Sequence, residues 1–516
     1  MIRKIVTRKI WLLVGVLTLA SASMAQTPLL PRENPRLVLV MVVDQMRYDY
    51  LTRYGTEFDS GLARLVREGA VFTNANYEAA PTMTAVGHST ILTGATPSSS
   101  GIAGNTWYER EEGRSVQSVT DDTVMALGGG NGASPRRLAV TTVGDELKAS
   151  GKGGKVFGVS LKDRGAILPA GRGADGAYWL VNGTFASSSW YFPALPEWVQ
   201  RYNAAKPADR YAGAQWLEAT MPTPAGPELY RALDSTPFAD QLVLDFALTL
   251  LREEALGTDA QTDLLSVSFS AVDYVGHASG PDTPLMHDMI LNIDKRIGEL
   301  LTSAERQAGR GKVLAVLTAD HGVSPVPEEL EAKGLPGGRY DTAAERDAVE
   351  QALSAAFGEA EYIEAAAEMG YYLKAEPLAG TPIAAEDLQR VAAAALRGMP
   401  HVARVYTRHE LETRREAGDR IDQRVRNGFS PLHSGDVLVV HEPNWLGNGY
   451  RGTTHGSPYS YDTHVPLIFW GPKTLVKPGL YHADAGVHDL APTLATMLRV
   501  ATPSGALGRV LNEIMP

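Results

Sequence analysis

The sequence predicts an α/β fold in which a mostly parallel central sheet is covered by helices on both faces. Several short runs of Leu, Val and Met lack polar alternation, which is typical of strands that are buried on both sides of a sheet. Stretches with apolar residues three and four positions apart lie between these runs and are typical of amphipathic helices. Strands that alternate with helices indicate a parallel sheet, whose ligand sites form at the carboxyl ends of the strands.

The apolar patterns place the individual elements. The predicted strands are Leu37–Val43, Lys155–Ser160, Leu264–Phe269, Val313–Thr318, Val437–His441 and Leu467–Trp470. Two helices are predicted at Pro284–Ser303 and His488–Leu498. In the first of these helices, Ile290, Ile293 and Ile297 share one face.

Two segments interrupt this pattern, and we expect both to be insertions that form a cap. Residues 170–235 are rich in Gly, Ala, Pro, Trp and Tyr and have no regular period. Residues 325–432 contain Ala-rich helical patterns at Ala348–Phe357 and Leu388–Leu396 and a strand at Val402–Tyr406, which together predict a small α/β unit. The core would then comprise residues 26–324 and 433–516.

The composition of the chain limits which binding partners and which metal ligands are possible. The chain has 516 residues, of which 44% are hydrophobic, enough for a large core that exceeds one typical domain. The net charge of -11 provides no general attraction for nucleic acid, so we expect no nucleic-acid partner. The sequence contains no cysteine, which excludes disulfides and thiolate ligands, so a bound metal must be held by carboxylates and imidazoles.

The first residues have the pattern of a secretory signal peptide. Basic residues at positions 3, 4, 8 and 9 precede the apolar run Ile10–Ala20, which is too short to span a bilayer comfortably. Small residues, Ser23 and Ala25, follow at the positions that signal cleavage requires. We expect residues 1–25 to be removed on export to the periplasm, leaving no stable membrane anchor. An uncleaved N-terminal anchor is the alternative.

Acidic and imidazole side chains follow three of the predicted strands. Asp44 follows Leu37–Val43 directly, and Asp320 and His321 follow Val313–Thr318. Asp273 and His277 come shortly after Leu264–Phe269, and their spacing of four places them on one side if the chain turns helically. Each residue alone has a structural explanation, such as capping a strand end. Their joint occurrence at three strand ends predicts a metal centre.

A further imidazole lies near the C-terminus, where His455 and His464 are both candidates. With His455 the set contains three carboxylates and three imidazoles. Divided between two ions, this set suits a pair of zinc ions with open positions for water and substrate.

A threonine is the candidate nucleophile. Pro81 precedes a helical pattern that places Thr84 at or near a helix N-terminus, where unpaired N–H groups and the helix dipole favour an anion. A hydroxyl beside a dication can ionise and attack phosphorus. The alternative is that Thr84, or Thr82, only caps the helix.

Three polar residues are candidates for binding a phosphoryl group. Lys162 and Arg164 follow the strand Lys155–Ser160 and would point to one side of an extended chain. A guanidinium fork and an ammonium charge together suit a dianionic phosphoryl group. Asn105 could donate its amide to a further oxygen. The alternatives are a solvated basic turn for the first pair and a turn residue for Asn105.

Taken together, these motifs resemble the alkaline phosphatase superfamily, and more narrowly the phosphate-irrepressible bacterial alkaline phosphatases that use a threonine nucleophile. These enzymes are related to nucleotide pyrophosphatase/phosphodiesterases, and the resemblance extends from about residue 36 to about residue 498. The resemblance implies that one zinc is bound by Asp44, Asp320 and His321, with Thr84 bridging toward it. It implies that the other zinc is bound by Asp273, His277 and His455. It also implies that phosphate is bound by Asn105, Lys162 and Arg164. It also favours zinc over manganese or iron. His455 is preferred over His464 because the family ligand precedes a glycine.

The resemblance implies an exported two-zinc alkaline phosphatase that hydrolyses small-molecule phosphate monoesters through a phosphothreonine at Thr84. A phosphodiesterase or nucleotide pyrophosphatase on the same fold is the alternative. Lys162 and Arg164 favour the monoesterase, because the diesterase relatives lack them. A third alternative is a metal-bearing domain of the cell envelope without turnover. No feature of the sequence reveals an oligomeric state, so a monomer is the working expectation.

Overall fold

The computed structural model describes residues 34–516, except 375, 378–381, 414–415 and 417. The predicted signal peptide, residues 1–25, lies outside the described residues. None of the helices in the described part combines the length and the apolar composition that crossing a bilayer requires.

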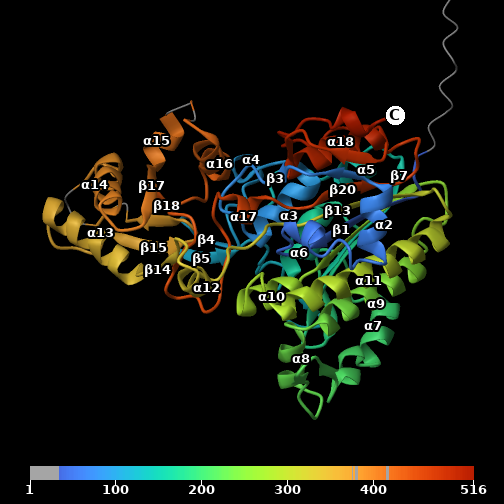
Figure 1. Cartoon of the computed structure of the whole chain (residues 1–516). Coiled ribbons are helices and arrows are strands. Elements are labelled where there is room, and N and C mark those ends of the chain that lie inside the picture. The colour runs from blue at the N-terminus through green and yellow to red at the C-terminus, as the bar shows by residue number, and fades with distance from the viewer. Residues whose placement is uncertain (1–33, 375, 378–381, 414–415, 417) are drawn as a thin grey trace, which may run out of the picture. The chain divides into compact units, whose positions relative to one another are not determined.

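The core of the fold is a ten-stranded sheet with the strand order β21-β2-β20-β13-β1-β12-β7-β8-β9-β6 (Figure 1). The strands are β1 (Leu37–Val43), β2 (Ala70–Phe72), β6 (Ala126–Leu127), β7 (Gly153–Ser160), β8 (Gly176–Val181), β9 (Thr184–Ser188), β12 (Thr262–Phe269), β13 (Val313–Thr318), β20 (Leu467–Trp470) and β21 (Gly479–Tyr481). The strands from β13 to β8 are parallel to their neighbours, whereas β20 and β9 are antiparallel. The predicted α/β class with a mostly parallel sheet is therefore confirmed.

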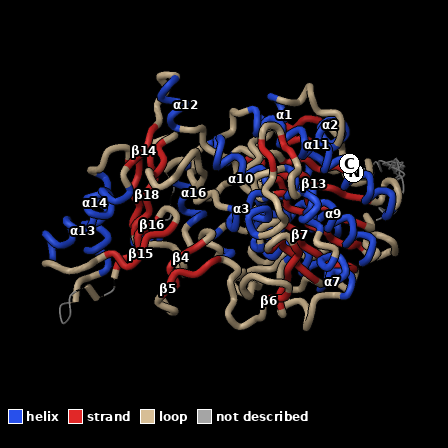
Figure 2. Tube along the Cα trace, turned by 90° about the horizontal axis from the view of Figure 1, so that it is seen from below, coloured by secondary structure: helices blue, strands red, loops and turns tan. Residues whose placement is uncertain are grey.

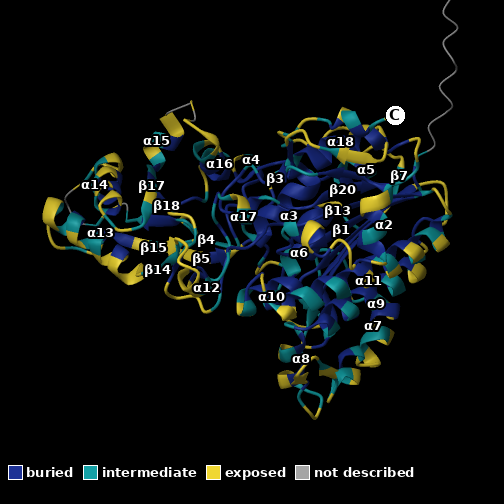
Figure 3. Ribbon diagram, in the orientation of Figure 1, coloured by how far each residue is buried: buried dark blue, intermediate teal, exposed yellow. Residues whose placement is uncertain are grey.

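Helices cover both faces of this sheet, which explains why its central strands lack polar alternation. All residues of β1, β12 and β13 are buried (Figure 3). On one face, α9 (Pro237–Glu253) and α11 (Pro284–Ala308) contact the central strands, and on the other α5 (Val143–Ala149) and α6 (Asp163–Ala170) do so. The hydroxyl of Thr283 caps α11, and Pro284 occupies its first turn, where the missing N–H of proline costs nothing.

A second, four-stranded sheet has the order β15-β16-β18-β17, and Figure 2 shows these strands beside two helices. The elements are β15 (Ile363–Ala367), β16 (Gly370–Leu373), β17 (Val402–Thr407), β18 (Val437–His441), α13 (Thr342–Phe357) and α14 (Ala385–Arg397). The helices and the strand predicted inside residues 325–432 are present. The placement of Val437–His441 among the core strands is wrong, because this strand pairs with β16 and β17. A buried apolar run does not itself indicate which sheet it joins.

The segment 170–235 also differs from the expected covering insertion. Its first part forms β8 and β9, which extend the central sheet beyond β7. Its remainder forms α7 (Glu197–Ala204), the short antiparallel pair β10 (Gln215–Trp216) and β11 (Ala219–Thr220), and α8 (Pro227–Leu233). Part of this segment therefore belongs to the sheet itself.

Candidate metal centre and nucleophile

Four neighbouring strands bring most of the predicted site residues to one edge of the central sheet. The strands β13, β1, β12 and β7 are adjacent and parallel, so their carboxyl ends meet at the same edge. Asp320 and His321 follow β13, Asp44 follows β1, and Lys162 follows β7. Asp273 lies in the first turn of α10, the helix that follows β12.

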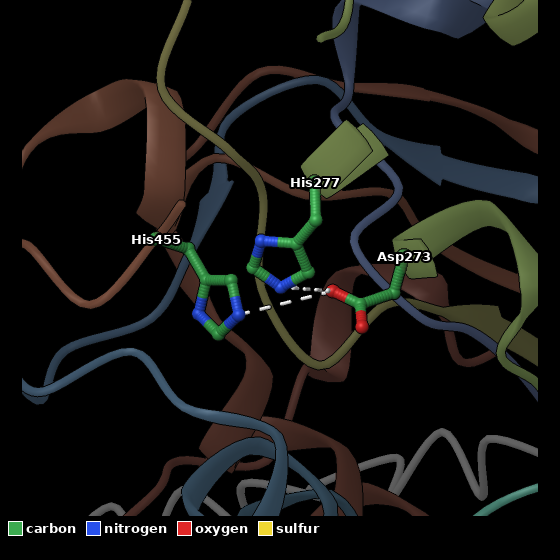
Figure 4. A group of neighbouring side chains, drawn as sticks. All are labelled: Asp273, His277 and His455. Carbon is green, nitrogen blue, oxygen red and sulfur yellow. Dashed lines mark ion pairs between the residues drawn. The ribbon is translucent and has the colours of Figure 1, made fainter. Parts of the chain in front are cut away.

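The first group of candidate ligands consists of Asp273, His277 and His455 (Figure 4). Asp273 and His277 are one turn apart in α10 (Ala271–Ser279), as their spacing predicts. The Nε2 atoms of His277 and His455 lie 3.2 Å and 3.8 Å from Oδ1 of Asp273. One ligand atom from each residue lies within 4.8 Å of the other two, so the three side chains converge on a common point.

A second group of candidate ligands is formed by Asp44, Asp273 and His321, again with ligand atoms within 4.8 Å of one another. The Nε2 atom of His321 lies 3.5 Å from Oδ1 of Asp44 and 3.4 Å from Oδ2 of Asp320. Asp44 and Asp320 therefore both lie near the same nitrogen atom of His321. The geometry brings together all six predicted carboxylates and imidazoles, with Asp273 contributing to both groups.

The three imidazole rings have the same hydrogen-bonding pattern, which leaves Nε2 of each ring facing the carboxylates. In each ring Nδ1 lies beside a backbone carbonyl oxygen, which can only accept, so Nδ1 carries the proton and Nε2 has a free lone pair. The accepting carbonyls are those of Thr453 at 2.9 Å for His277, Gly322 at 2.9 Å for His321, and Thr82 at 2.7 Å for His455. Burial lowers the pKa values of His321 and His455, which keeps these rings neutral, as metal ligation requires.

Two carboxylate oxygens of the site also lack ordinary partners. Oδ1 of Asp44 and Oδ2 of Asp320 are buried and accept no hydrogen bond among the described residues. Burial, reinforced by the neighbouring charge of Asp320, raises the pKa of Asp44 well above its usual range. The second oxygen of each carboxylate has a partner, but a buried carboxylate oxygen without one is costly unless a cation or a donor compensates it. Buried oxygen and imidazole ligands without thiolates thus fit a pair of divalent ions.

Thr84 is the first residue of α3 (Thr84–Thr93), and its hydroxyl Oγ1 lies 3.4 Å from Nε2 of His321. The residue before the helix is Met83, whose side chain makes no capping hydrogen bond. The hydroxyl of Thr82 instead donates to the carbonyl of Ser457 and accepts from the N–H of Gly456. The alternative that Thr82 or Thr84 acts only as the helix cap is therefore wrong.

Of the predicted phosphate-binding residues, Asn105 contacts the first turn of α3 and Lys162 contacts two of the candidate ligands. Oδ1 of Asn105 accepts a hydrogen bond of 2.9 Å from the N–H of Ala85, which leaves the amide nitrogen of Asn105 to donate elsewhere. Nζ of Lys162 lies 2.7 Å from Asp44 and 2.6 Å from Asp273. Nε of Arg164 is buried and has no hydrogen-bond partner among the residues that the structure describes. The extended backbone predicted through residue 164 is wrong, because α6 begins at Asp163.

His464 lies outside both groups of candidate ligands. Its ring stacks on Tyr48 with centroids 4.5 Å apart, and its Nε2 lies 3.0 Å from the carbonyl oxygen of Thr73. Of the two imidazoles that the sequence offers near the C-terminus, the structure thus places His455 beside the carboxylates.

Three residues that the sequence did not single out hold the site in place. Gln45 donates its side-chain amide to Asp273 and its backbone N–H to Asp320. His88 places Nδ1 2.9 Å from the carbonyl oxygen of Thr84 and 3.2 Å from Oδ2 of Asp320. Glu368 accepts hydrogen bonds from the N–H groups of Asn105 and Thr106. Gln45 adjoins Asp44 and His88 lies one turn after Thr84, whereas no local pattern identifies Glu368.

Comparison with known proteins agrees with this geometry. A sequence profile of the family described as "Type I phosphodiesterase / nucleotide pyrophosphatase" matches residues 38–465. The chain belongs to this family. It is 34% identical to alkaline phosphatase PafA of Elizabethkingia meningoseptica over 99% of each sequence, and 32% identical to alkaline phosphatase PhoV of Synechococcus elongatus over 93% of each. The crystal structure of wild-type PafA superimposes with a TM-score of 0.86, covering 94% of this chain and 99% of that one at 32% identity.

The predicted membership in the alkaline phosphatase superfamily, on the PafA-like, phosphate-irrepressible branch related to nucleotide pyrophosphatases, is therefore confirmed. PafA and PhoV, which match this member of the family along nearly its whole length, are alkaline phosphatases, that is, phosphomonoesterases. A protein of Myroides odoratus that is 34% identical over 93% of the chain is named a calcium-transporting ATPase.

Replacing His455 with alanine tests whether the converging imidazoles bind metal. We expect His455→Ala to lose about one metal ion per chain, because it removes one of three ligands from the first group. His464→Ala is the matched control and should keep the metal content of the wild type. Elemental analysis of the purified variants measures both. Full metal content in His455→Ala, or equal loss in the two variants, would contradict the assignment.

Proposed function

We propose that this protein is a two-zinc phosphatase that hydrolyses phosphate monoesters through a covalent phosphothreonine at Thr84. The observation that carries the proposal is the position of the Thr84 hydroxyl at a helix N-terminus, 3.4 Å from Nε2 of His321, which belongs to the second group of candidate ligands. The alkaline phosphatases that match the chain over nearly its whole length support the same chemistry.

In this proposal one zinc would be held by Asp44, Asp320 and His321 beside the Thr84 hydroxyl, and the other by Asp273, His277 and His455. Bound dications would supply positive charge that lowers the pKa of a nearby hydroxyl and offsets the charge of the phosphoryl oxygens. Zinc is favoured because its usual protein ligands include imidazole and carboxylate groups.

The chain's own groups would carry out two displacements at phosphorus. In the first, Oγ1 of Thr84 forms a bond to phosphorus while the bond to the ester oxygen breaks and the alcohol leaves. In the second, water attacks the same phosphorus, the bond to Oγ1 breaks, and inorganic phosphate and the free hydroxyl result. The N-terminus of α3 stabilises the negative charge near Oγ1 in both steps. Such loose transition states depend mainly on positioning and charge.

Three polar side chains would hold the transferred phosphoryl group. The free amide nitrogen of Asn105 and the unpartnered guanidinium nitrogen of Arg164 are available donors. The ammonium of Lys162 lies between Asp44 and Asp273. It would add a positive charge close to the phosphoryl oxygens. Two cationic side chains suit a monoester, which carries one more negative charge than a diester.

A phosphodiesterase is the second candidate, because the matching family is described as type I phosphodiesterase / nucleotide pyrophosphatase. A diester has only one charged phosphoryl oxygen and a second ester group to accommodate. It would therefore depend less on Lys162 and Arg164 than a monoester does.

The N-terminal pattern leads to a further expectation, export to the periplasm. Residues 1–25 combine a basic start, the apolar run Ile10–Ala20 and a small residue at position 25. We expect the mature protein to begin at Gln26. Edman sequencing of the protein recovered from a periplasmic fraction measures this, and an intact start at Met1 would contradict it.

Removing the nucleophile gives the most direct activity test. We expect Thr84→Ala to lower kcat for p-nitrophenyl phosphate by more than about a thousandfold, because it removes the hydroxyl that would take up the phosphoryl group. Thr90→Ala, in the same helix, is the control, since the hydroxyl of Thr90 bonds only to the carbonyl of Val86. Circular dichroism and metal content verify that both variants fold. Hydrolysis at the wild-type rate by Thr84→Ala would refute the covalent route.

Arg164 separates the monoesterase from the diesterase. We expect Arg164→Ala to lower kcat/KM for p-nitrophenyl phosphate by about tenfold to a hundredfold, the loss expected when a hydrogen bond to a charged group disappears. The loss on bis-p-nitrophenyl phosphate should be much smaller. Arg67→Ala, whose side chain is 67% exposed, is the control. Equal losses on both substrates would contradict the role of Arg164.

A further inference from the structure

A cavity of about 520 Å³ is lined in part by Met83, the residue that precedes the candidate nucleophile. The cavity lining also includes His455, whose ring stacks on His321 with centroids 3.5 Å apart. Its other walls come from strands that follow residue 325, including β16 and β18. Cavities of this size are typical of small-molecule sites, and an apolar cavity of about 150 Å³ already accommodates benzene.

Aromatic side chains line much of this cavity. They are Tyr340, Tyr371, Trp445, Tyr450, Tyr459 and Tyr461. Two of them are held by stacking, Tyr340 on His441 at 3.6 Å and Trp445 on His401 at 3.2 Å between ring centroids. Tyr450, by contrast, is 51% exposed. Ring faces and edges of this kind favour flat apolar groups.

The charged groups of the cavity disfavour an ionic occupant. Its acidic residues include Glu345, Glu368 and Glu442, against one basic residue, Arg346, so the field opposes a further anion. The three glutamates already have partners: His441 at 2.7 Å for Glu345, His401 at 3.1 Å for Glu442, and the N–H groups of Asn105 and Thr106 for Glu368. The fourth acidic residue of the lining, Asp462, accepts two hydrogen bonds from Ser457 at Oδ2, and its Oδ1 is buried away from solvent. Among the described residues, no carboxylate group of the lining is therefore both without a partner and open to an ammonium group.

We infer that this cavity is the subsite for the leaving group, and that it selects phosphate monoesters of uncharged aromatic alcohols. The inference rests on the proposed phosphatase function and adds its substrate class. With phosphorus at Thr84, the substituent on the ester oxygen passes His455 and Met83 into the cavity and lies against the ring of Tyr450. The strands that line the cavity thus determine substrate choice, while the edge of the central sheet provides the chemistry.

Binding of non-hydrolysable phosphonates tests the subsite independently of turnover. Calorimetry on the metal-loaded enzyme compares phenylphosphonate with methylphosphonate, which lacks the ring. Tyr450→Ala is expected to weaken phenylphosphonate binding by about threefold to tenfold, as loss of one aromatic contact implies, with little effect on methylphosphonate. Tyr450→Phe, which keeps the ring, should retain the wild-type affinity. Leu480→Ala, at a side chain that is 61% exposed in β21, is the control.

The other outcomes overturn the inference. Equal weakening of both phosphonates, or no weakening of either, shows that Tyr450 does not contact the leaving group. 2-Aminoethylphosphonate is measured in the same way as a cationic probe. If Tyr450→Ala weakens the binding of this compound alone, the cavity is a site for cationic alcohols. Turnover of phenyl phosphate by the same preparation tests the proposed function separately. If the protein binds phenylphosphonate through Tyr450 but hydrolyses no phosphate monoester, the phosphatase function is contradicted and the aromatic subsite is not.

Discussion

The register of four neighbouring parallel strands is the constraint on which the site depends. Val43 at the end of β1 lies opposite Phe269 of β12, and Val42 lies opposite Thr318 of β13. These strands end level with one another, so the residues that follow them meet at one place. Burial of the strands between two layers of helices fixes this register, because a slip by one residue would turn every side chain to the opposite face.

A close approach between α3 and the end of β13 fixes the nucleophile relative to the candidate ligands. A Cβ atom at Gly87 would lie 2.2 Å from the carbonyl oxygen of Asp320, so only glycine permits this packing. His88, one turn after Thr84 in α3, links this helix to the end of β13, because its imidazole contacts both the carbonyl of Thr84 and the carboxylate of Asp320. The position of the hydroxyl is thus determined by backbone packing and by a buried imidazole.

The sequence predicts the core of this arrangement because its buried parallel strands are continuous apolar runs. Asp44 and Asp320 were predictable from their positions at strand ends, and Asp273 and His277 from their helical spacing. Other features depend on contacts between distant segments. The pairing of Val437–His441 with the smaller sheet and the contact of Glu368 with Asn105 have no local pattern. Gln45 adopts a left-handed backbone, φ 67°, which its residue type does not indicate. The choice of His455 over His464 needed the family resemblance.

The most direct measurement of the central claim is anomalous diffraction at the zinc absorption edge from crystals of the purified protein. The account predicts two peaks at the edge of the central sheet. One would lie about 2.0–2.2 Å from ligand atoms of Asp273, His277 and His455, and the other would lie beside His321 and Thr84. A single peak, no peak, or peaks away from these side chains would contradict the account.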